Sequence, residues 1–387
     1  MEHHAELKGR ALVVLSLLWF LWFINLGARA MFSPILPLIE DEFVISHARA
    51  SGIFTVQSIG YAISLFFSGI YSGRLGYKKC IALSLAVSSG LLFLIPFVKA
   101  FSTLVIFSFI LGFSIGTYLP SVLPLITEYF AEKHWGKSIA IHDSAASVSI
   151  FCIPFIALFL LHFFVWRGIF TVMAVVFLMS AIVFFLVSDE LKITHSRKTM
   201  RGDLLKTRAL WILGILWIFA SGAYWGVYFA IPLFLTKELS LSIGYANTVL
   251  GISRLGGIAV AIMCGVLVDR FSLRKITFTM LLFTGLFTIL VGVASVRFMA
   301  IFLFFQVIFV TGFFPMGLVS IARTFDRETR GMATGSVLIL SVLFGSGLIP
   351  YLLGLSGDLI GFRFGIVLLG IMVTASSPLI FCLKELE

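Results

Sequence analysis

The sequence predicts an all-α membrane protein with twelve transmembrane helices, arranged as two six-helix bundles that are parallel repeats of each other. Three observations lead to this prediction. Long apolar segments recur along the whole chain, one long polar segment divides it near the middle, and residues on either side match at a constant spacing. Of the 387 residues, 60% are hydrophobic and only 12% are charged, against about 25% charged residues in soluble domains. So little charge cannot cover a water-facing surface, and a lipid bilayer is the expected surrounding.

Each apolar segment is long enough to cross the ~30 Å hydrocarbon core of a bilayer, which takes about 20 residues of α-helix. The alternating segments of about ten residues that are typical of a transmembrane β-barrel do not occur. We expect helices over residues 11–39, 49–72, 80–99, 102–126, 138–163, 167–187, 209–235, 245–268, 275–293, 297–322, 331–357 and 362–384.

The longest polar segment, residues 188–208, divides the expected helices into two groups of six. We therefore expect an N-terminal bundle over residues 1–187 and a C-terminal bundle over residues 209–387. With the N-terminus inside, 20 lysines and arginines fall on the inner side and six on the outer side. The positive-inside rule then predicts a cytoplasmic (inner) membrane protein with both termini in the cytoplasm. The net charge of +10 thus indicates topology and not nucleic-acid binding.

The two halves repeat each other at an offset of 196 residues. The segment from Glu42 to Ser46 matches the segment from Glu238 to Ser242. At the same offset Gly60 matches Gly256, Gly69 matches Gly265, Arg74 matches Arg270, Lys78 matches Arg274 and Lys79 matches Lys275. Both halves run in the same direction, as expected for parallel repeats about an axis along the membrane normal.

Residues 265–275, GVLVDRFSLRK, combine a glycine, an aspartate followed by an arginine, and a basic pair. This segment resembles the loop signature of the major facilitator superfamily, roughly G-x-x-x-D-R-x-G-[RK]-[RK], and the resemblance covers the whole chain. It implies a secondary transporter, and it makes Asp269 and Arg270 candidates for an inner gate, in which the carboxylate latches against a helix N-terminus. Residues 69–79, GIYSGRLGYKK, repeat the pattern with Gly73 in place of the aspartate.

Two arginines lie inside apolar segments, Arg29 in the first and Arg254 in the eighth. An intramembrane arginine costs at least ~2.5–3.5 kcal/mol on insertion scales and therefore indicates a function. At 1.5 Å per residue, both lie about 15 Å from the outer helix ends, the depth at which transporters bind substrates. No carboxylate is expected at that depth, so a bound anion is the most economical counter-charge, and guanidinium matches carboxylate geometry. The alternative is that both arginines bind backbone carbonyls and only hold helices together.

At an offset of 195 residues, set by Pro37 and Pro232, Arg29 corresponds to Tyr224, and at 196 residues Ser58 corresponds to Arg254, so the two arginines are not copies of each other. The run from Arg29 to Pro37, R-x-x-F-x-x-x-x-P, resembles a segment of organophosphate:phosphate antiporters. An arginine in the eighth helix is similar to monocarboxylate and nitrate porters. These resemblances imply an anionic substrate and leave the anion open.

Further polar residues inside the expected helices are candidates for lining a substrate cavity. Residues four apart share a helix face, which pairs Asn25 with Arg29 and Tyr224 with Tyr228. Converging hydroxyl and amide groups suit a cavity that orients a polar ligand, and ordinary interhelical hydrogen bonding is the competing explanation. The candidates are Asn25, Gln57, Tyr118, Tyr224, Tyr228 and Gln306.

His142 and Asp143 lie toward the cytoplasmic end of the helix expected over residues 138–163. Histidine titrates near neutral pH, so this pair could carry a coupling proton. The alternative is an inner-gate polar cluster with Lys137 or the loop around Asp269. The second explanation is favoured because neighbouring residues on a helix do not face each other.

These observations predict transport of a small organic anion by alternating access, with Arg29 and Arg254 as counter-charges and a coupling proton left open. The first alternative is an exporter of amphipathic or hydrophobic compounds, and the second is a non-transporting membrane receptor on the same fold. No nucleophile–base pair, metal cluster or phosphate-binding loop is predicted, so we expect no enzyme, catalytic residue, metal or cofactor. The expected partners are the substrate and the bilayer, and a monomer is the habit that the superfamily resemblance implies.

Overall fold

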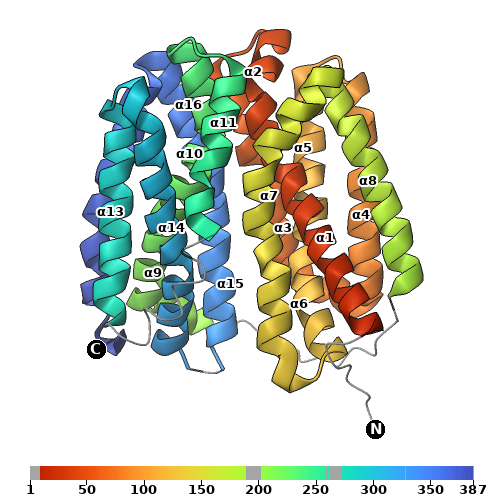
Figure 1. Ribbon diagram of the computed structural model, residues 1–387. Coiled ribbons are helices and arrows are strands. Elements are labelled where there is room, and N and C mark those ends of the chain that lie inside the picture. Colours follow the sequence, from red (N-terminus) through yellow and green to blue (C-terminus); the bar gives the residue numbers. More distant parts are fainter. Residues whose placement is uncertain (1–8, 189–201, 259, 261–271, 327, 387) are drawn as a thin grey trace. The chain divides into compact units, whose positions relative to one another are not determined.

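The computed structural model describes residues 9–188, 202–258, 260, 272–326 and 328–386 (Figure 1). Within these ranges every regular element is a helix and no strand is assigned. Contacts along the chain define two compact units: unit 1 comprises Met1–Phe32 and Val56–Arg197, and unit 2 comprises Ser33–Thr55 and Lys198–Glu387. The segment Ser33–Thr55 therefore groups with the C-terminal half of the sequence. The predicted bundle boundaries at residues 187 and 209 stay a prediction.

Unit 1 contains long helices joined by short turns. Its helices are α1 (Arg10–Ala30), most of α3 (His47–Leu75), α4 (Tyr77–Leu94), η1 (Ile95–Phe97), α5 (Phe101–Gly116), α6 (Tyr118–Tyr129), η2 (Glu132–His134), α7 (Trp135–Phe163) and α8 (Trp166–Val187). The break after α3 falls at Gly76 and the end of α4 is followed by Pro96, while α7 and α8 are separated by Phe164 and Val165.

Unit 2 contains α2 and the first turns of α3 together with the helices of the C-terminal half. Its elements are α2 (Phe32–Phe43), η3 (Gly202–Lys206), α9 (Arg208–Ser221), η4 (Gly222–Gly226), α10 (Val227–Leu233), η5 (Phe234–Glu238), α11 (Ile243–Ser253), α13 (Leu273–Val293), α14 (Val296–Thr324), α15 (Arg330–Leu340), η6 (Ser341–Leu348), α16 (Ile349–Leu359), α17 (Phe362–Ser376), η7 (Ser377–Cys382) and η8 (Lys384–Leu386). Two of its described membrane spans include π-helical segments: η4 and η5 lie in one span, and η6 lies in another. The other η elements of this unit are short 3-10 helices.

The predicted fold class is confirmed. Eleven helical spans of the described residues are long and apolar enough to cross a membrane, and each lies where the hydrophobic pattern predicts one. The remaining predicted helix, 245–268, begins as α11, and its residues 259 and 261–268 lie outside the described part of the chain, as do Asp269 and Arg270. Large apolar side chains on the outside of the spans, such as Phe66 (60% exposed) and Leu186 (76% exposed), supply the surface that lipid covers.

The sequence repeat is visible in equivalent contacts of the two units. In unit 1 α4 packs along α8, and in unit 2 α13 packs along α17 (Figure 1). Arg167, at the start of α8, donates from Nη1 to the carbonyl oxygen of Pro96 at 3.1 Å. Arg363, 196 residues later and at the start of α17, donates from Nη1 to the carbonyl oxygens of Gly292 and Ala294 at 2.8 and 2.9 Å. Each repeat thus uses one arginine to cap the end of a neighbouring helix.

Two glycines let α3 and α5 approach closely in unit 1. A Cβ atom at Gly112 would lie 2.0 Å from the carbonyl oxygen of Gln57, and one at Gly60 would lie 2.2 Å from that of Phe109. Small residues at a crossing allow backbones to touch in the way that drives helix association in lipid. This crossing fixes the part of α3 that carries Ser58.

Candidate functional site

Both intramembrane arginines are buried, and each meets polar or aromatic groups of its own unit. In unit 1, Arg29 on α1 is 4% exposed, and its Nη2 donates to the Ser58 hydroxyl at 2.8 Å. Its guanidinium carbon lies 5.5 Å from the ring centre of Tyr61. In unit 2, Arg254 ends α11 and is 2% exposed. Its guanidinium carbon lies 5.2 and 4.9 Å from the ring centres of Tyr224 and Tyr228, within the ~6 Å range of cation–π attraction.

Arg254 differs from most buried arginines in its hydrogen bonding. None of its three guanidinium nitrogens makes a hydrogen bond of ordinary geometry within the part of the chain that the structure describes, and the Tyr224 side chain is its nearest hydrogen-bonding neighbour. The hydroxyl of Tyr228, which is fully buried, also has no partner there. Buried polar groups are normally hydrogen-bonded, and each exception requires an explanation. Arg254 and Tyr228 together therefore present unused donors beside one another.

The repeat relates the surroundings of the two arginines. Arg29 and Tyr224 occupy equivalent positions, as do Ser58 and Arg254. In unit 1 the arginine of the first helix bonds the serine of the second, and in unit 2 the arginine of the second helix lies over the tyrosine of the first. Both units thus carry one arginine at this pair of equivalent positions. In unit 1 the first helix supplies it, and in unit 2 the second helix does.

Tyr224 is held by an interruption of its helix. It lies in the π-helical segment η4, and such segments are frequent at functional sites. A Cβ atom at Gly222 would lie 2.1 Å from Cδ1 of Ile349 on α16, so a larger residue there would require the Ile349 side chain to move. From α14, Gln306 Nε2 donates to the carbonyl oxygen of Ala223 at 2.8 Å. The segment is therefore fixed from two sides.

The structure places the other predicted cavity residues in different roles. Asn25 Nδ2 donates to the carbonyl oxygen of Ile115 at 3.3 Å, and the Tyr118 hydroxyl donates to that of Leu18 at 2.8 Å. Both are interhelical hydrogen bonds. Gln57 is fully buried, and neither of its amide atoms has a partner among the described residues. Of the predicted set, Tyr224, Tyr228 and Arg254 come together, with Gln306 beside them.

His142 and Asp143 separate, as their adjacent places on one helix require. His142 is fully buried, and its ring stacks near Trp22 and Tyr118, with centroid distances of 5.8 and 5.9 Å. Asp143 lies on the exposed side of α7 together with Lys137. The predicted involvement of the loop around Asp269 falls outside the described residues.

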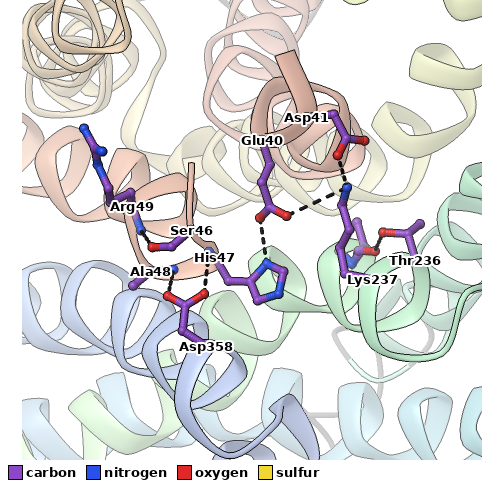
Figure 2. A network of polar contacts seen from close by, with 10 residues as sticks. Glu40, Asp41, Ser46, His47, Ala48, Arg49, Thr236, Lys237 and Asp358 are labelled. Carbon is purple, nitrogen blue, oxygen red and sulfur yellow. Dashed lines mark hydrogen bonds and ion pairs between the residues drawn. The ribbon is translucent and has the colours of Figure 1, made fainter. Parts of the chain in front are cut away.

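A polar network that the sequence did not indicate joins Ser33–Thr55 to the rest of unit 2. Figure 2 shows Glu40 between His47 and Lys237, with Nδ1 of His47 at 2.8 Å and Nζ of Lys237 at 3.8 Å from its carboxylate oxygens. Lys237 also bonds Asp41. The carboxylate of Asp358 accepts from the backbone nitrogens of His47 and Ala48 at 2.8 and 2.9 Å.

Comparisons with known proteins agree with this architecture. A family model described as the Major Facilitator Superfamily matches residues 18–270 and 213–386. The chain is 23% identical, over 223 residues, to a putative niacin/nicotinamide transporter of Bacillus subtilis (strain 168), with 54% of this chain and 55% of that protein covered. It is 27% identical, over 150 residues, to a niacin transporter of Acinetobacter baylyi, with 36% of this chain and 34% of that protein covered. The matched region thus spans about half the length of the first relative and about a third of the second.

Two solved structures share the fold over nearly the whole chain. A bacterial homologue of the human lysosomal transporter Spinster, in an inward-facing and unoccupied conformation, aligns with a TM-score of 0.83, 14% identity and 98% coverage of both chains. A D-xylose–proton symporter aligns with a TM-score of 0.75 and 16% identity, covering 96% of this chain and 98% of that one.

Proposed function

Because the chain belongs to the Major Facilitator Superfamily, we propose that it is a secondary active transporter that moves a small organic anion by alternating access. Membership of this family of transporters makes it a multi-pass membrane protein and not an enzyme. What we propose beyond this is that the substrate is an organic anion and that Arg254 and Arg29 bind it.

The environment of Arg254 is the observation that supports an anion. A guanidinium offers five N–H donors and no acceptor, and within the described residues none of the Arg254 nitrogens makes a hydrogen bond of ordinary geometry. The Tyr228 hydroxyl adds a donor at the same place. A carboxylate accepts several hydrogen bonds and supplies the missing negative charge, so it satisfies both groups at once.

The aromatic side chains around Arg254 favour a carboxylate attached to a flat ring. Tyr224 and Tyr228 turn ring faces toward the guanidinium, and Trp225 packs edge-to-face on Tyr224 with ring centres 5.3 Å apart. Aromatic rings stack or pair edge-to-face at such distances. One relative is named a putative niacin/nicotinamide transporter and another a niacin transporter, and niacin is a pyridine carboxylate. We therefore take nicotinate as the first substrate to test.

Arg29 is the proposed second counter-charge. Its guanidinium is buried and oriented by the hydroxyl of Ser58, and it lies 5.5 Å from the ring centre of Tyr61. An arginine in this setting can attract an anion into the membrane interior. We further propose that both termini face the cytoplasm, as the distribution of basic residues indicates.

A thermal-stability screen of the purified protein tests the proposal. The probes are nicotinate, benzoate, phosphate esters and, as a matched uncharged analogue, nicotinamide. A ligand that binds only the folded protein adds ~2.7 kcal/mol of stability at 100 times its Kd. Nicotinate or another carboxylate should raise the Tm of the wild type, nicotinamide should raise it far less, and Arg254→Gln should abolish the difference.

The matched control is Arg297→Gln, because Arg297 is exposed and its guanidinium stacks on its neighbour Phe298. This variant should keep the full response to the carboxylate. Equal responses to nicotinate and nicotinamide, unchanged in Arg254→Gln, would overturn the anion proposal. Stabilisation by amphipathic cations alone would favour the exporter instead.

A further inference from the structure

His142 is a buried histidine that the proposed anion site does not use. Its side chain is fully buried in α7. Trp22 of α1 and Tyr118 of α6 lie nearly parallel to its ring, with interplanar angles of 16° and 19° and centroid distances of 5.8 and 5.9 Å. Trp22 and Tyr118 also stack on each other at 5.6 Å. The imidazole is therefore enclosed by aromatic rings inside unit 1.

The hydrogen bonds of Tyr118 assign the tautomer of His142. The Tyr118 hydroxyl has one hydrogen, which it donates to the carbonyl oxygen of Leu18 at 2.8 Å. The same oxygen lies 3.3 Å from Nε2 of His142, and toward that nitrogen it can only accept. Nε2 therefore carries the hydrogen of the neutral imidazole, and the lone pair is on Nδ1.

Nδ1 of His142 is an acceptor without a donor. It is buried and has no hydrogen-bond partner within the described residues. An unsatisfied lone pair on a basic nitrogen can accept a proton, and because burial disfavours the charged imidazolium, we expect protonation when the site opens to water and release when it closes. The alternative donors for Nδ1 are a water molecule or a ligand, and both would form only a hydrogen bond.

The other titratable groups near α7 leave His142 as the candidate. Asp143 follows it on the other side of the helix, where its carboxylate faces the indole of Trp22 and not the imidazole. Among the described residues of the elements packed on α7, Tyr118 is the titratable group that contacts the imidazole directly. The remaining titratable or charged residues of α1, α6, α8 and η2 are Arg10, Arg29, Glu128, Tyr129, Arg167, Glu132, Lys133 and His134.

We propose that Nδ1 of His142 carries a proton that crosses the membrane with the anion, which makes the protein an anion–proton symporter. This inference rests on the proposed anion transport. One proton binds the Nδ1 lone pair to give imidazolium on one side of the membrane and leaves it on the other, restoring the neutral ring. One proton and one monovalent anion together carry no net charge, so the membrane potential does not oppose the step.

The aromatic surroundings suit a proton that must be released again. An imidazolium would lie beside the rings of Trp22 and Tyr118, whose own centres are 5.6 Å apart, and contact with these rings stabilises the charge less than pairing with a fixed carboxylate. A carboxylate bonded to Nδ1 would hold the proton through the whole cycle. Within the described residues Nδ1 has no carboxylate partner. This suits a site that must release its proton, because the charged imidazolium is then only modestly stabilised.

Proteoliposomes that contain the full chain test this inference with labelled nicotinate. An imposed pH difference should drive accumulation in the wild type, up to about tenfold per pH unit for one proton per anion, beyond the uptake of protein-free liposomes. In weakly buffered vesicles, nicotinate entry should also alkalinise the outside medium. His142→Gln should lose the accumulation while nicotinate exchange without a pH difference continues. His162→Gln, on the exposed side of the same helix, is the matched control and should retain both.

The outcomes separate this inference from the proposed function. A wild type without nicotinate or other carboxylate exchange contradicts the anion proposal itself. Exchange without proton movement in the wild type, or accumulation in His142→Gln at the wild-type level, overturns the proton site alone. If His142→Gln does not exchange, Tyr118→Phe decides, because it removes the contact that fixes the tautomer and keeps the imidazole. Its uptake should show a shifted pH profile, and an unchanged profile would overturn the assignment.

Discussion

The carboxylate of Asp358 caps the N-terminus of α3 at His47, 311 residues away in the sequence. Its two oxygens accept from the backbone nitrogens of His47 and Ala48 at 2.8 and 2.9 Å, and Figure 2 shows it beside the contacts among Glu40, His47 and Lys237. Negative charge at a helix N-terminus is favourable because the first N–H groups have no partners within the helix. Through these contacts Ser33–Thr55 joins the C-terminal half of the chain in unit 2.

Removing this cap should loosen the start of α3. Asp358→Ala should lower the local stability of the start of α3 by about 1 kcal/mol, the usual effect of losing an N-terminal cap. That energy corresponds to about a fivefold larger population in which the start of α3 is unfolded. Ser51, which is 1% exposed near the start of α3, can report this as a cysteine in a background without the native cysteines. An impermeant maleimide should label it faster in Asp358→Ala.

Glu238→Gln provides the control for that measurement. Glu238 also caps a helix, through the backbone nitrogen of Phe362 at the start of α17, and it pairs with Arg363 at 4.0 Å. Phe362 also packs on His47, with ring centres 5.1 Å apart, so this variant tests whether position 51 responds to a neighbouring cap, and its labelling should rise less than in Asp358→Ala. Equal acceleration in both variants would mean general destabilisation instead.

Tyr228 and Tyr118 should respond oppositely to loss of their hydroxyls. Both are fully buried, but the Tyr118 hydroxyl donates to Leu18 and that of Tyr228 has no partner among the described residues. Tyr118→Phe should lower stability by about 1 kcal/mol, the typical net value of one hydrogen bond. Tyr228→Phe should keep or raise the Tm and weaken carboxylate binding about tenfold, since hydrogen bonds to charged groups contribute ~1.5–3 kcal/mol. Calorimetric unfolding and ligand titration measure the two quantities. Unchanged carboxylate affinity in Tyr228→Phe would remove this hydroxyl from the site.

The close crossing of α3 and α5 should tolerate no added methyl group. Gly112→Ala would place its Cβ 2.0 Å from the carbonyl oxygen of Gln57, and relieving that overlap must separate two backbones at a cost of about 1–3 kcal/mol. Gly90→Ala is the control, because a Cβ there meets nothing within 4 Å. The Tm should fall in the first variant and stay constant in the second. Similar Tm values for both would show that the crossing can relax.

The two helix caps of the repeats should contribute similarly to stability. Arg363→Gln removes charged donors from the carbonyl oxygens of Gly292 and Ala294, and Arg167→Gln removes them from Ile95 and Pro96. Each loss should cost about 1–2 kcal/mol, reduced from the buried value because both arginines are partly exposed. Thermal unfolding in detergent measures this, with the exposed Arg297→Gln as the neutral comparison. A loss confined to one of the two variants would contradict equivalence.

The helices were predictable because hydrophobic length is a local property. The segments 167–187 and 275–293, for example, became α8 (Trp166–Val187) and α13 (Leu273–Val293). The burial of Arg254 was predictable for the same reason, since a charge inside an apolar segment is visible without coordinates. Its neighbours Tyr224 and Tyr228 were candidates because they lie four residues apart on one helix. That spacing could not give their distances from the Arg254 guanidinium.

Several parts of the candidate site depend on which helices meet. Ser58 was identifiable as the repeat partner of Arg254, and only the packing of α1 against α3 made it the partner of Arg29. The tautomer of His142 on α7 depends on Tyr118 of α6, whose hydroxyl donates to the carbonyl oxygen of Leu18 on α1. No spacing rule connects such residues, because their separation in the sequence is set by intervening loops.

The sequence by itself determined that this chain crosses a membrane many times, that it is a duplicated transporter, and that two buried charges need partners. These follow from hydrophobic length, repetition and the cost of charge in lipid. The tertiary structure alone decided that Arg29 is held by Ser58, that Arg254 makes no hydrogen bond of ordinary geometry within the described residues, and that Asp358 ties α3 to α16. The physical reason is that hydrogen bonds act over about 3 Å, a distance that only folding establishes between residues far apart in the chain.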